Sequence, residues 1–258
     1  MKSDNNNHLW QVWDREADTW DRFIESGGDI TRLLIHGPGM LELCLPAEGL
    51  KILDIGCGQG FFSRELARQG AKVTAFDFSP NMIKIAKEKE AENPLGIEYL
   101  ILDAEKAGEL LEEESYDKVT ACMSVMDIQN PFAAIKGAAK VLKTGGNFIF
   151  SIPHPCTDTK LRKWHKDAEG KTIGLTINYY FEAGMDTFNW VETAIGKDMI
   201  TPFHRFTLTQ WSEMLYNSGL SIKRIREPKP DENLLAEKPG LSSMAKIPYF
   251  MVFETVKI

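Results

Sequence analysis

The sequence predicts an α/β protein organised around a doubly wound, mostly parallel β-sheet. Short apolar segments alternate with segments of helical apolar spacing along most of the 258 residues, and this cadence is typical of such sheets. Three successive apolar segments end on an acidic residue, namely Asp54, Asp77 and Asp103. Ligands of these sheets bind outside the carboxyl ends of the strands, so the three carboxylates are expected to line one crevice.

Residues 1–46 are expected to form a helical cover. The first eight residues are polar and should be frayed. Apolar and aromatic side chains recur at near-helical spacing over 10–24, a glycine pair at 27–28 interrupts them, and 38–44 predicts a further helix. Two interpretations of the tryptophans stay open: they attach the cover to the core, or some of them line a ligand site (Trp10, Trp13 and Trp20).

Seven strands and the helices between them follow from the apolar pattern. Pro80 after Ser79 suits the first turn of a helix, and Thr207 or Thr209 can cap another. Residues 228–240 are expected to be a loop. The strands are expected at 51–54, 72–77, 97–102, 117–122, 147–152, 220–226 and 247–256, with helices at 61–68, 80–86, 131–142 and 207–218.

The region after the fifth strand departs from this repeat. Two prolines, Pro153 and Pro155, stop the strand, and about fifty residues of mixed character follow. Within them, 172–181 and 188–192 show the alternation and aromatic content of β-strands. We therefore expect a small antiparallel lid inside an insertion that spans 153–206.

The glycine-rich segment from Asp54 to Gly60 is the strongest functional signal. A buried strand, a tight turn and a helix start follow one another there, and glycines let a ligand lie directly against the backbone. The spacing is G-x-G-x-G, whereas the dinucleotide fingerprint is G-x-G-x-x-G. A carboxylate two residues before the first glycine would repel a pyrophosphate and favour an ammonium or a sulfonium.

This segment, read as D-x-G-x-G-x-G, resembles motif I of the class I S-adenosylmethionine (SAM)-dependent methyltransferases. The resemblance extends over 51–258 and implies a Rossmann-like, seven-stranded domain spanning 47–258. It also implies an enzyme that uses SAM as its cofactor and releases S-adenosylhomocysteine (SAH). The residues expected to contact the cofactor are Asp54, Gly56, Cys57, Gly58, Gly60, Asp77, Phe78, Met82, Asp103, Ala104 and Met123.

The resemblance gives several of these residues a role. Asp77 would bridge the two ribose hydroxyls with charge-assisted hydrogen bonds, and Phe78 and Met82 could flank the adenine. Asp103 or the amide of Ala104 would contact the adenine amino group. The turn at 142–146 resembles the L-x-P-G-G turn of the family, although Thr144 stands where a proline is usual.

A small metabolite is the expected methyl acceptor, through an O, N or S atom. The tip of the fourth strand, at 122–127, lacks the N-P-P-Y-type tetrad of the enzymes that methylate amino groups of nucleic acids. The formal net charge is −7 and no basic stripe is visible, which argues against a nucleic-acid partner.

Methyl transfer from an activated sulfonium needs a base only when the acceptor enters protonated. The candidates for this role are His154 at the end of the fifth strand, His204 where the lid returns, and Tyr179 within the lid. No metal is expected, since the spacing of His154, Cys156, His165 and His204 matches no compact ligand pattern.

Four cysteines without a C-x-x-C pair favour a reduced, cytoplasmic protein. No apolar segment reaches transmembrane length, so we expect no membrane association, and a monomer or a homodimer. Two alternative functions stay open. One is an NAD-dependent oxidoreductase, disfavoured by the glycine spacing, and the other is a non-catalytic module that binds SAM or SAH.

Overall fold

The computed structural model describes residues 11–190 and 199–258. The frayed segment expected at 1–8 and Trp10 of the expected first helix lie outside these residues. The same holds for the last two positions, 191 and 192, of the second expected lid strand.

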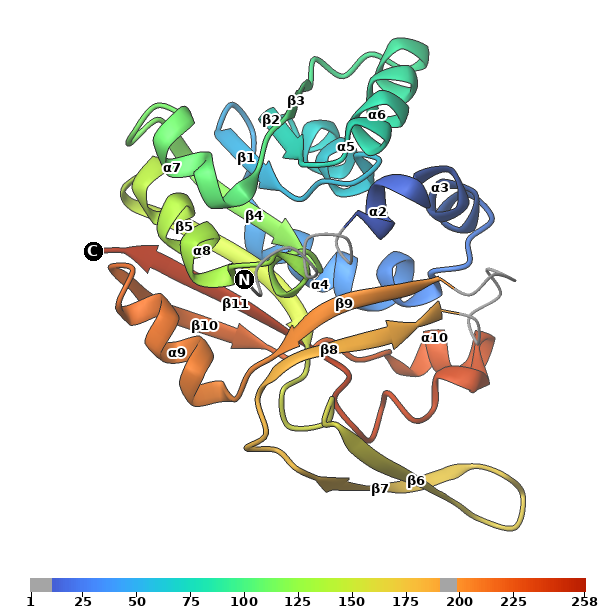
Figure 1. The fold of residues 1–258 in the computed structure, drawn as a ribbon. Coiled ribbons are helices and arrows are strands. Elements are labelled where there is room, and N and C mark those ends of the chain that lie inside the picture. Colours follow the sequence, from blue (N-terminus) through green and yellow to red (C-terminus); the bar gives the residue numbers. More distant parts are fainter. Residues whose placement is uncertain (1–10, 191–198) are drawn as a thin grey trace.

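One seven-stranded sheet forms the centre of the molecule (Figure 1). The strand order is β10-β11-β5-β4-β1-β2-β3. Strands β1 to β5 run parallel, and β11 is antiparallel to both β5 and β10. This arrangement confirms the predicted fold class. The strands are β1 (Lys51–Ile55), β2 (Lys72–Asp77), β3 (Glu98–Ile101), β4 (Tyr116–Cys122), β5 (Leu142–Pro153), β10 (Leu220–Arg226) and β11 (Phe250–Lys257).

Helices cover both faces of this sheet. One apolar cluster joins Met40, Leu66 and Ile83 to the first face, and a second cluster joins Ile135 and Trp211 to the opposite face. The alternation of side chains along each buried strand supplies both clusters at once. The first face carries α4 (Gly37–Cys44), α5 (Phe61–Arg68) and α6 (Pro80–Glu92), and the second carries α7 (Ala107–Leu110), α8 (Pro131–Val141) and α9 (Leu208–Tyr216).

The N-terminal segment lies against α6. It forms two short helices, α2 (Val12–Arg15) and α3 (Ala17–Glu25), where the apolar spacing predicts one. The Asp14 carboxylate attaches it, because Oδ1 accepts hydrogen bonds from the Ser79 hydroxyl at 2.6 Å and the Asn81 amide at 3.0 Å.

A π-helical turn, η1 (Arg32–His36), leads directly into α4. The sequence analysis did not anticipate it. Pro38 offers one physical reason, because it has no N–H to donate to the carbonyl four residues earlier and its ring crowds that carbonyl. Such turns are frequent at functional sites, where they redirect side chains.

The insertion forms two separate hairpins, and the expectation of one small lid sheet is corrected in this respect. Strand β7 (Thr172–Asn178) pairs with β6 (Leu161–Lys166), whereas β8 (Gly184–Asn189) pairs with β9 (Ile200–Arg205). In Figure 1 the β8–β9 hairpin crosses in front of the sheet and β6–β7 extends away from it. Strand β6 was missed because three of its six residues are Arg or Lys, which hides the alternation.

Two boundaries near the C-terminus also differ from the expectation. Residues 228–240 contain helix α10 (Glu232–Glu237), which Asp231 caps by accepting from the Leu234 amide at 2.8 Å, and the turn η5 (Pro239–Leu241). Strand β11 starts at Phe250, three residues later than expected.

Candidate functional site

A cavity of about 760 Å³ lies at the carboxyl edge of β1 to β4. Its volume is in the range of about 300–1,000 Å³ that is usual for small-molecule sites. The strand ends and the loops that follow them contribute 56–59, 76–78, 102–105, 122–124 and 126–129 to its lining. The N-terminal segment, β6 and the β8–β9 hairpin supply further walls through Trp13, Trp20, Arg32, His36, Trp164, Phe188 and Trp190.

The turn after β1 brings bare backbone to this cavity. Gly56, Gly58 and Gly60 all have positive φ angles, of 63°, 54° and 82°. A Cβ atom on Gly60 would lie 2.4 Å from the Tyr99 hydroxyl, whereas one on Gly58 would meet no described atom within 4 Å. Gly60 therefore permits close packing, and Gly58, which lines the cavity, leaves room for a ligand against the chain.

Asp54 lies beneath this turn and is fully buried, outside the lining of the cavity. Its carboxylate accepts hydrogen bonds from the Ser63 hydroxyl at 2.6 Å and the Thr120 hydroxyl at 2.8 Å. These bonds connect β1 to α5 and β4. Burial raises the pKa of Asp54 to about 6, and the two hydroxyls oppose that rise. The position indicates a residue that shapes the turn.

Asp77 reaches the cavity from the end of β2. Oδ2 accepts from the Gly58 amide at 2.9 Å and Oδ1 from the Ser79 amide at 2.9 Å. Burial raises the pKa of Asp77 to about 6, with a smaller contribution from Asp14, and the amides act in the opposite direction. Each carboxylate oxygen keeps acceptor capacity, so a diol in the cavity could hydrogen-bond to it.

Most of the other predicted cofactor residues also line the cavity. They are Gly56, Cys57, Phe78, Met82, Asp103, Ala104 and Met123. Gly60, like Asp54, is not among the residues that line the cavity. Met123 has a φ of 51° and donates its amide to the Ser151 hydroxyl at 3.0 Å. Asp103 accepts from the Glu105 amide at 3.0 Å, which fixes its carboxylate at the tip of β3.

His154 is buried and its ring lies outside the lining of the cavity. Nε2 lies 2.8 Å from Oε1 of Glu227, and Nδ1 accepts from the Cys156 amide at 3.2 Å. Both ring nitrogens therefore have protein partners. This geometry favours a role in holding the end of β5.

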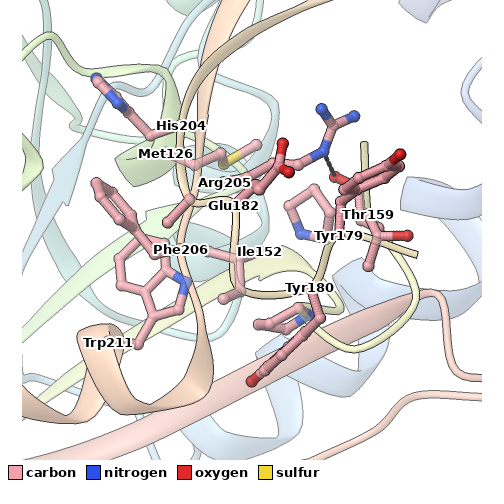
Figure 2. Close-up of a pocket in the computed structure, with 14 residues that line it drawn as sticks. Met126, Ile152, Thr159, Tyr179, Tyr180, Glu182, His204, Arg205, Phe206 and Trp211 are labelled. Atoms are coloured by element: carbon pink, nitrogen blue, oxygen red, sulfur yellow. Dashed lines mark ion pairs between the residues drawn. The ribbon is translucent and has the colours of Figure 1, made fainter. Parts of the chain in front are cut away.

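Tyr179 and His204 lie at a second, smaller hollow of about 20 Å³ (Figure 2). That volume suffices for about one water molecule. Nε2 of His204 lies 3.1 Å from the Gln129 carbonyl oxygen, and its ring stacks on Phe206. Burial lowers the pKa of His204. The structure thus separates these two candidates from the residues around the glycine turn.

An aromatic cluster closes the large cavity on the side of the N-terminal segment. The ring of Trp20 lies 5.3 Å from that of Trp13 and 4.8 Å from that of Trp190, and Phe188 lies 4.7 Å from Trp190. These edge-to-face contacts attach the cover to the β8–β9 hairpin. Trp13 and Trp20 therefore serve both roles left open for them, attachment and lining.

Asp127 and His36 are among the titratable side chains in the lining that the sequence analysis did not single out. Burial raises the pKa of Asp127, at the tip of β4, well above its usual value. His36 is 2% exposed, and burial lowers its pKa to about 4. Neither fits a known motif position in the sequence; only the fold brings them to the cavity.

Among residues 11–190 and 199–258, no group of three or more His, Cys, Asp or Glu side chains is arranged to hold a metal ion. No helix there is long and apolar enough to cross a membrane.

Comparisons with known proteins agree with the geometry. Residues 53–150 match the family model described as a methyltransferase domain. A ubiquinone biosynthesis O-methyltransferase of Xanthomonas axonopodis pv. citri is 34% identical over 147 residues, which cover 54% of this chain and 59% of that protein. The chain thus spans about half the length of the curated relatives it matches.

Two solved structures extend the likeness. An S-adenosylmethionine-dependent methyltransferase of Mesorhizobium loti superposes with a TM-score of 0.72 and 26% identity, over 85% of this chain and 96% of that one. A phosphoethanolamine N-methyltransferase of Haemonchus contortus, in complex with SAM, shares the fold with a TM-score of 0.56 and 19% identity, over 86% of this chain and 52% of that one.

The parallel sheet with its edge cavity defines an α/β protein of the nucleotide-binding class. Within that class, residues 53–150 match a methyltransferase domain, and the fold is similar to that of a SAM-dependent methyltransferase.

Proposed function

We propose that this protein transfers the methyl group of SAM to a hydroxyl oxygen of a small molecule. The observation that carries the proposal is the junction of Gly58 and Asp77, which presents bare backbone and a buried carboxylate to one large cavity. The name of the curated relatives, O-methyltransferase, favours oxygen over nitrogen or sulfur as the acceptor atom.

The residues that line the cavity fit the chemistry of this cofactor. Asp77 would accept hydrogen bonds from the ribose hydroxyls, Phe78 and Met82 would flank the adenine, and Asp103 with Ala104 would meet its amino group. Gly56, Cys57, Gly58 and Met123 would contact the rest of the molecule. Asp54 and Gly60 would act indirectly by shaping the turn, because both lie outside the lining.

The bound cofactor supplies an activated methyl group on a sulfonium. The protein must align the acceptor oxygen with that group and exclude water. The aromatic cluster of Trp13, Trp20, Phe188 and Trp190 would cover the cavity for this purpose.

The acceptor proton must leave as the new C–O bond forms and the C–S bond breaks. Asp127 is the group we propose to take it. Asp127 lines the cavity, and its carboxyl has no hydrogen-bond or ion-pair partner within residues 11–190 and 199–258. Burial also makes it a stronger base than an exposed carboxylate. His154, His204 and Tyr179, the earlier candidates, have positions that suit this step less well.

We further propose the domain division expected from the sequence, with a cover at 1–46, a methyltransferase domain at 47–258 and an insertion at 153–206. The net charge of −7 supports a protein without nucleic-acid partners. The scattered cysteines support a cytoplasmic location. We also propose that the protein is a monomer or a homodimer and that it has no membrane partners.

An acceptor screen tests the proposal. The protein is incubated with SAM and a panel of small phenols, catechols, amines and thiols, and SAH formation is measured. Acceptor-dependent release of SAH, with a methyl ether as co-product, is the expected result. Binding of SAM without turnover on the whole panel would favour a non-catalytic binding module instead.

A further inference from the structure

The β6–β7 hairpin projects from the rest of the molecule and leaves one side of β7 open (Figure 1). The two strands form a sheet of their own, in which β7 pairs with β6 and with no other strand of the described residues. The backbone N–H and C=O groups along the outer edge of β7 therefore lack a partner strand. Such an edge is a template for pairing with another chain.

Strand β7 lacks the charges that usually protect an open edge. Its sequence, T-I-G-L-T-I-N, contains no Asp, Glu, Lys or Arg, whereas each of the other ten strands within residues 11–190 and 199–258 contains at least one. Charged side chains and prolines on an edge strand discourage pairing with another chain. Since β7 carries neither, nothing in its composition opposes the addition of a strand.

Three apolar side chains share one face of β7. Side chains alternate between the two faces of a strand, so Ile173, Leu175 and Ile177 point to the same side as Trp164, which lies opposite Leu175 in the hairpin. Leu175 is half-buried, but Ile173 and Ile177 are 59% and 40% exposed. The hairpin thus leaves two isoleucines uncovered, one on each side of the centre of the strand.

The order of residues in β7 is self-complementary about Leu175. In an antiparallel pair of two copies with a two-fold axis at Leu175, Ile173 of each copy would lie opposite Ile177 of the other. Leu175 would lie opposite its own counterpart, and the small and polar residues of the other face would meet one another. Apolar residues directly opposite each other stabilise antiparallel strands, and reciprocal contacts of this kind characterise a two-fold interface.

Strand β6 would end the sheet that two copies share. The pairing would give four strands, with β6 of each copy at the two edges. Arg162, Lys163 and Lys166 make β6 strongly cationic, and charges at an edge discourage the addition of a further strand. The assembly should therefore close as a dimer and should not extend into a fibre.

We propose that β7 is the dimerisation edge of this protein, and that it pairs antiparallel with β7 of a second copy about Leu175. The proposal does not depend on methyl transfer. It has a consequence for the large cavity, because Trp164 of β6 lines that cavity and stacks on Tyr249 with ring centroids 5.4 Å apart. The dimer would hold this part of the cavity wall from outside.

Sedimentation velocity of the full chain over a range of concentrations tests the proposal, and the wild-type protein should form a dimer. In Ile173→Lys/Ile177→Lys the new lysines of the two copies would face each other, so the dimer dissociation constant should rise at least about tenfold. In Ile173→Lys/Ile177→Glu each lysine would face a glutamate of the other copy, and the dimer should form again.

Ile222→Lys/Ile225→Lys is the matched control, because both residues are exposed on β10, which is also an edge strand. This variant should remain a dimer, and thermal melting shows that each variant is folded. Four results would overturn the proposal: a monomeric wild-type protein, an assembly larger than a dimer, a dimer that survives the two lysines in β7, or a lysine–glutamate variant that stays monomeric. Loss of the dimer in the control alone would place the interface on β10 and would also overturn it.

Discussion

The backbone N–H of Gly58 donates a hydrogen bond of 2.9 Å to Oδ2 of Asp77. This bond connects the turn after β1 to the end of β2, and both residues line the large cavity. The glycine turn and the acidic strand end, which are separate signals in the sequence, are therefore one structural unit.

Gly58→Ala tests the need for bare backbone in that unit. The positive φ of 54° makes alanine unfavourable by about 1–2 kcal/mol, and the new methyl group would occupy ligand space. Gly49→Ala is the matched control, because Gly49 has a φ of 73°, equally open surroundings and a place before β1. Both variants should lose similar stability in urea melts, but SAH binding should fall in Gly58→Ala alone. Equal SAH affinities of the two variants would argue against a need for bare backbone at Gly58.

Asp77→Asn tests the carboxylate. Loss of charge-assisted hydrogen bonds should weaken SAH binding by about 1.5–3 kcal/mol, measured by calorimetry. Glu88→Gln, on the exposed face of α6, serves as the control and should bind normally. Wild-type affinity in Asp77→Asn would remove this residue from the cofactor site.

The affinity for SAH should depend on pH through the same residue. The pKa of Asp77 is raised to about 6, and the ionised form is the one that accepts two hydroxyl hydrogen bonds. Lowering the pH from 7 to 5 protonates most of it, so the dissociation constant should rise by up to about tenfold. In Asp77→Asn this dependence should disappear; its persistence would point to another group, such as Asp54.

Asp127→Asn should slow turnover without affecting SAH affinity. Loss of a general base typically costs about 10²- to 10⁴-fold in rate. Because burial raises the pKa of Asp127, wild-type kcat should increase with pH over the range in which this carboxyl loses its proton, and this limb should be absent in the variant. His154→Gln is the comparison. We expect this substitution to lower the melting temperature clearly and to change kcat only slightly. A normal kcat in Asp127→Asn would contradict the assignment.

Trp20→Ala should loosen the cover. The substitution removes ring contacts with Trp13 and Trp190, and truncations of large aromatic residues cost about 3–5 kcal/mol when they are fully buried. Trp20 is half-buried, so a smaller loss is expected, together with a higher KM for the acceptor found by the screen. Unchanged stability and KM would show that the cluster does not close the site.

The sheet could be predicted from the sequence because each core strand carries its own signal. Apolar residues followed by an acid mark the ends of β1 and β2, and the glycine spacing marks the turn between them. These local patterns were enough to predict the positions of the strands. They were also enough to predict that Asp77 and Gly58 lie at the same edge of the sheet, since the carboxyl ends of parallel strands meet there.

The rest of the site depends on contacts between distant segments. Arg32 and His36 reach the cavity through a π-helical turn, and no periodic pattern predicts one. His154 stands at the expected edge, but Glu227, 73 residues later, engages its ring. The partner strands β6 and β9 were missed because Arg and Lys residues interrupt the apolar alternation in β6, and Pro202, a residue unfavourable in strands, lies within β9.

Thermal melting in the presence of SAH or NAD tests the central claim, that the large cavity is a SAM site, most directly. At a hundred times its dissociation constant, a ligand stabilises the folded state by about 2.7 kcal/mol. We predict a clear rise in melting temperature with SAH, none with NAD, and a reduced rise with SAH in Asp77→Asn. A rise with NAD alone, or with neither ligand, would contradict the account.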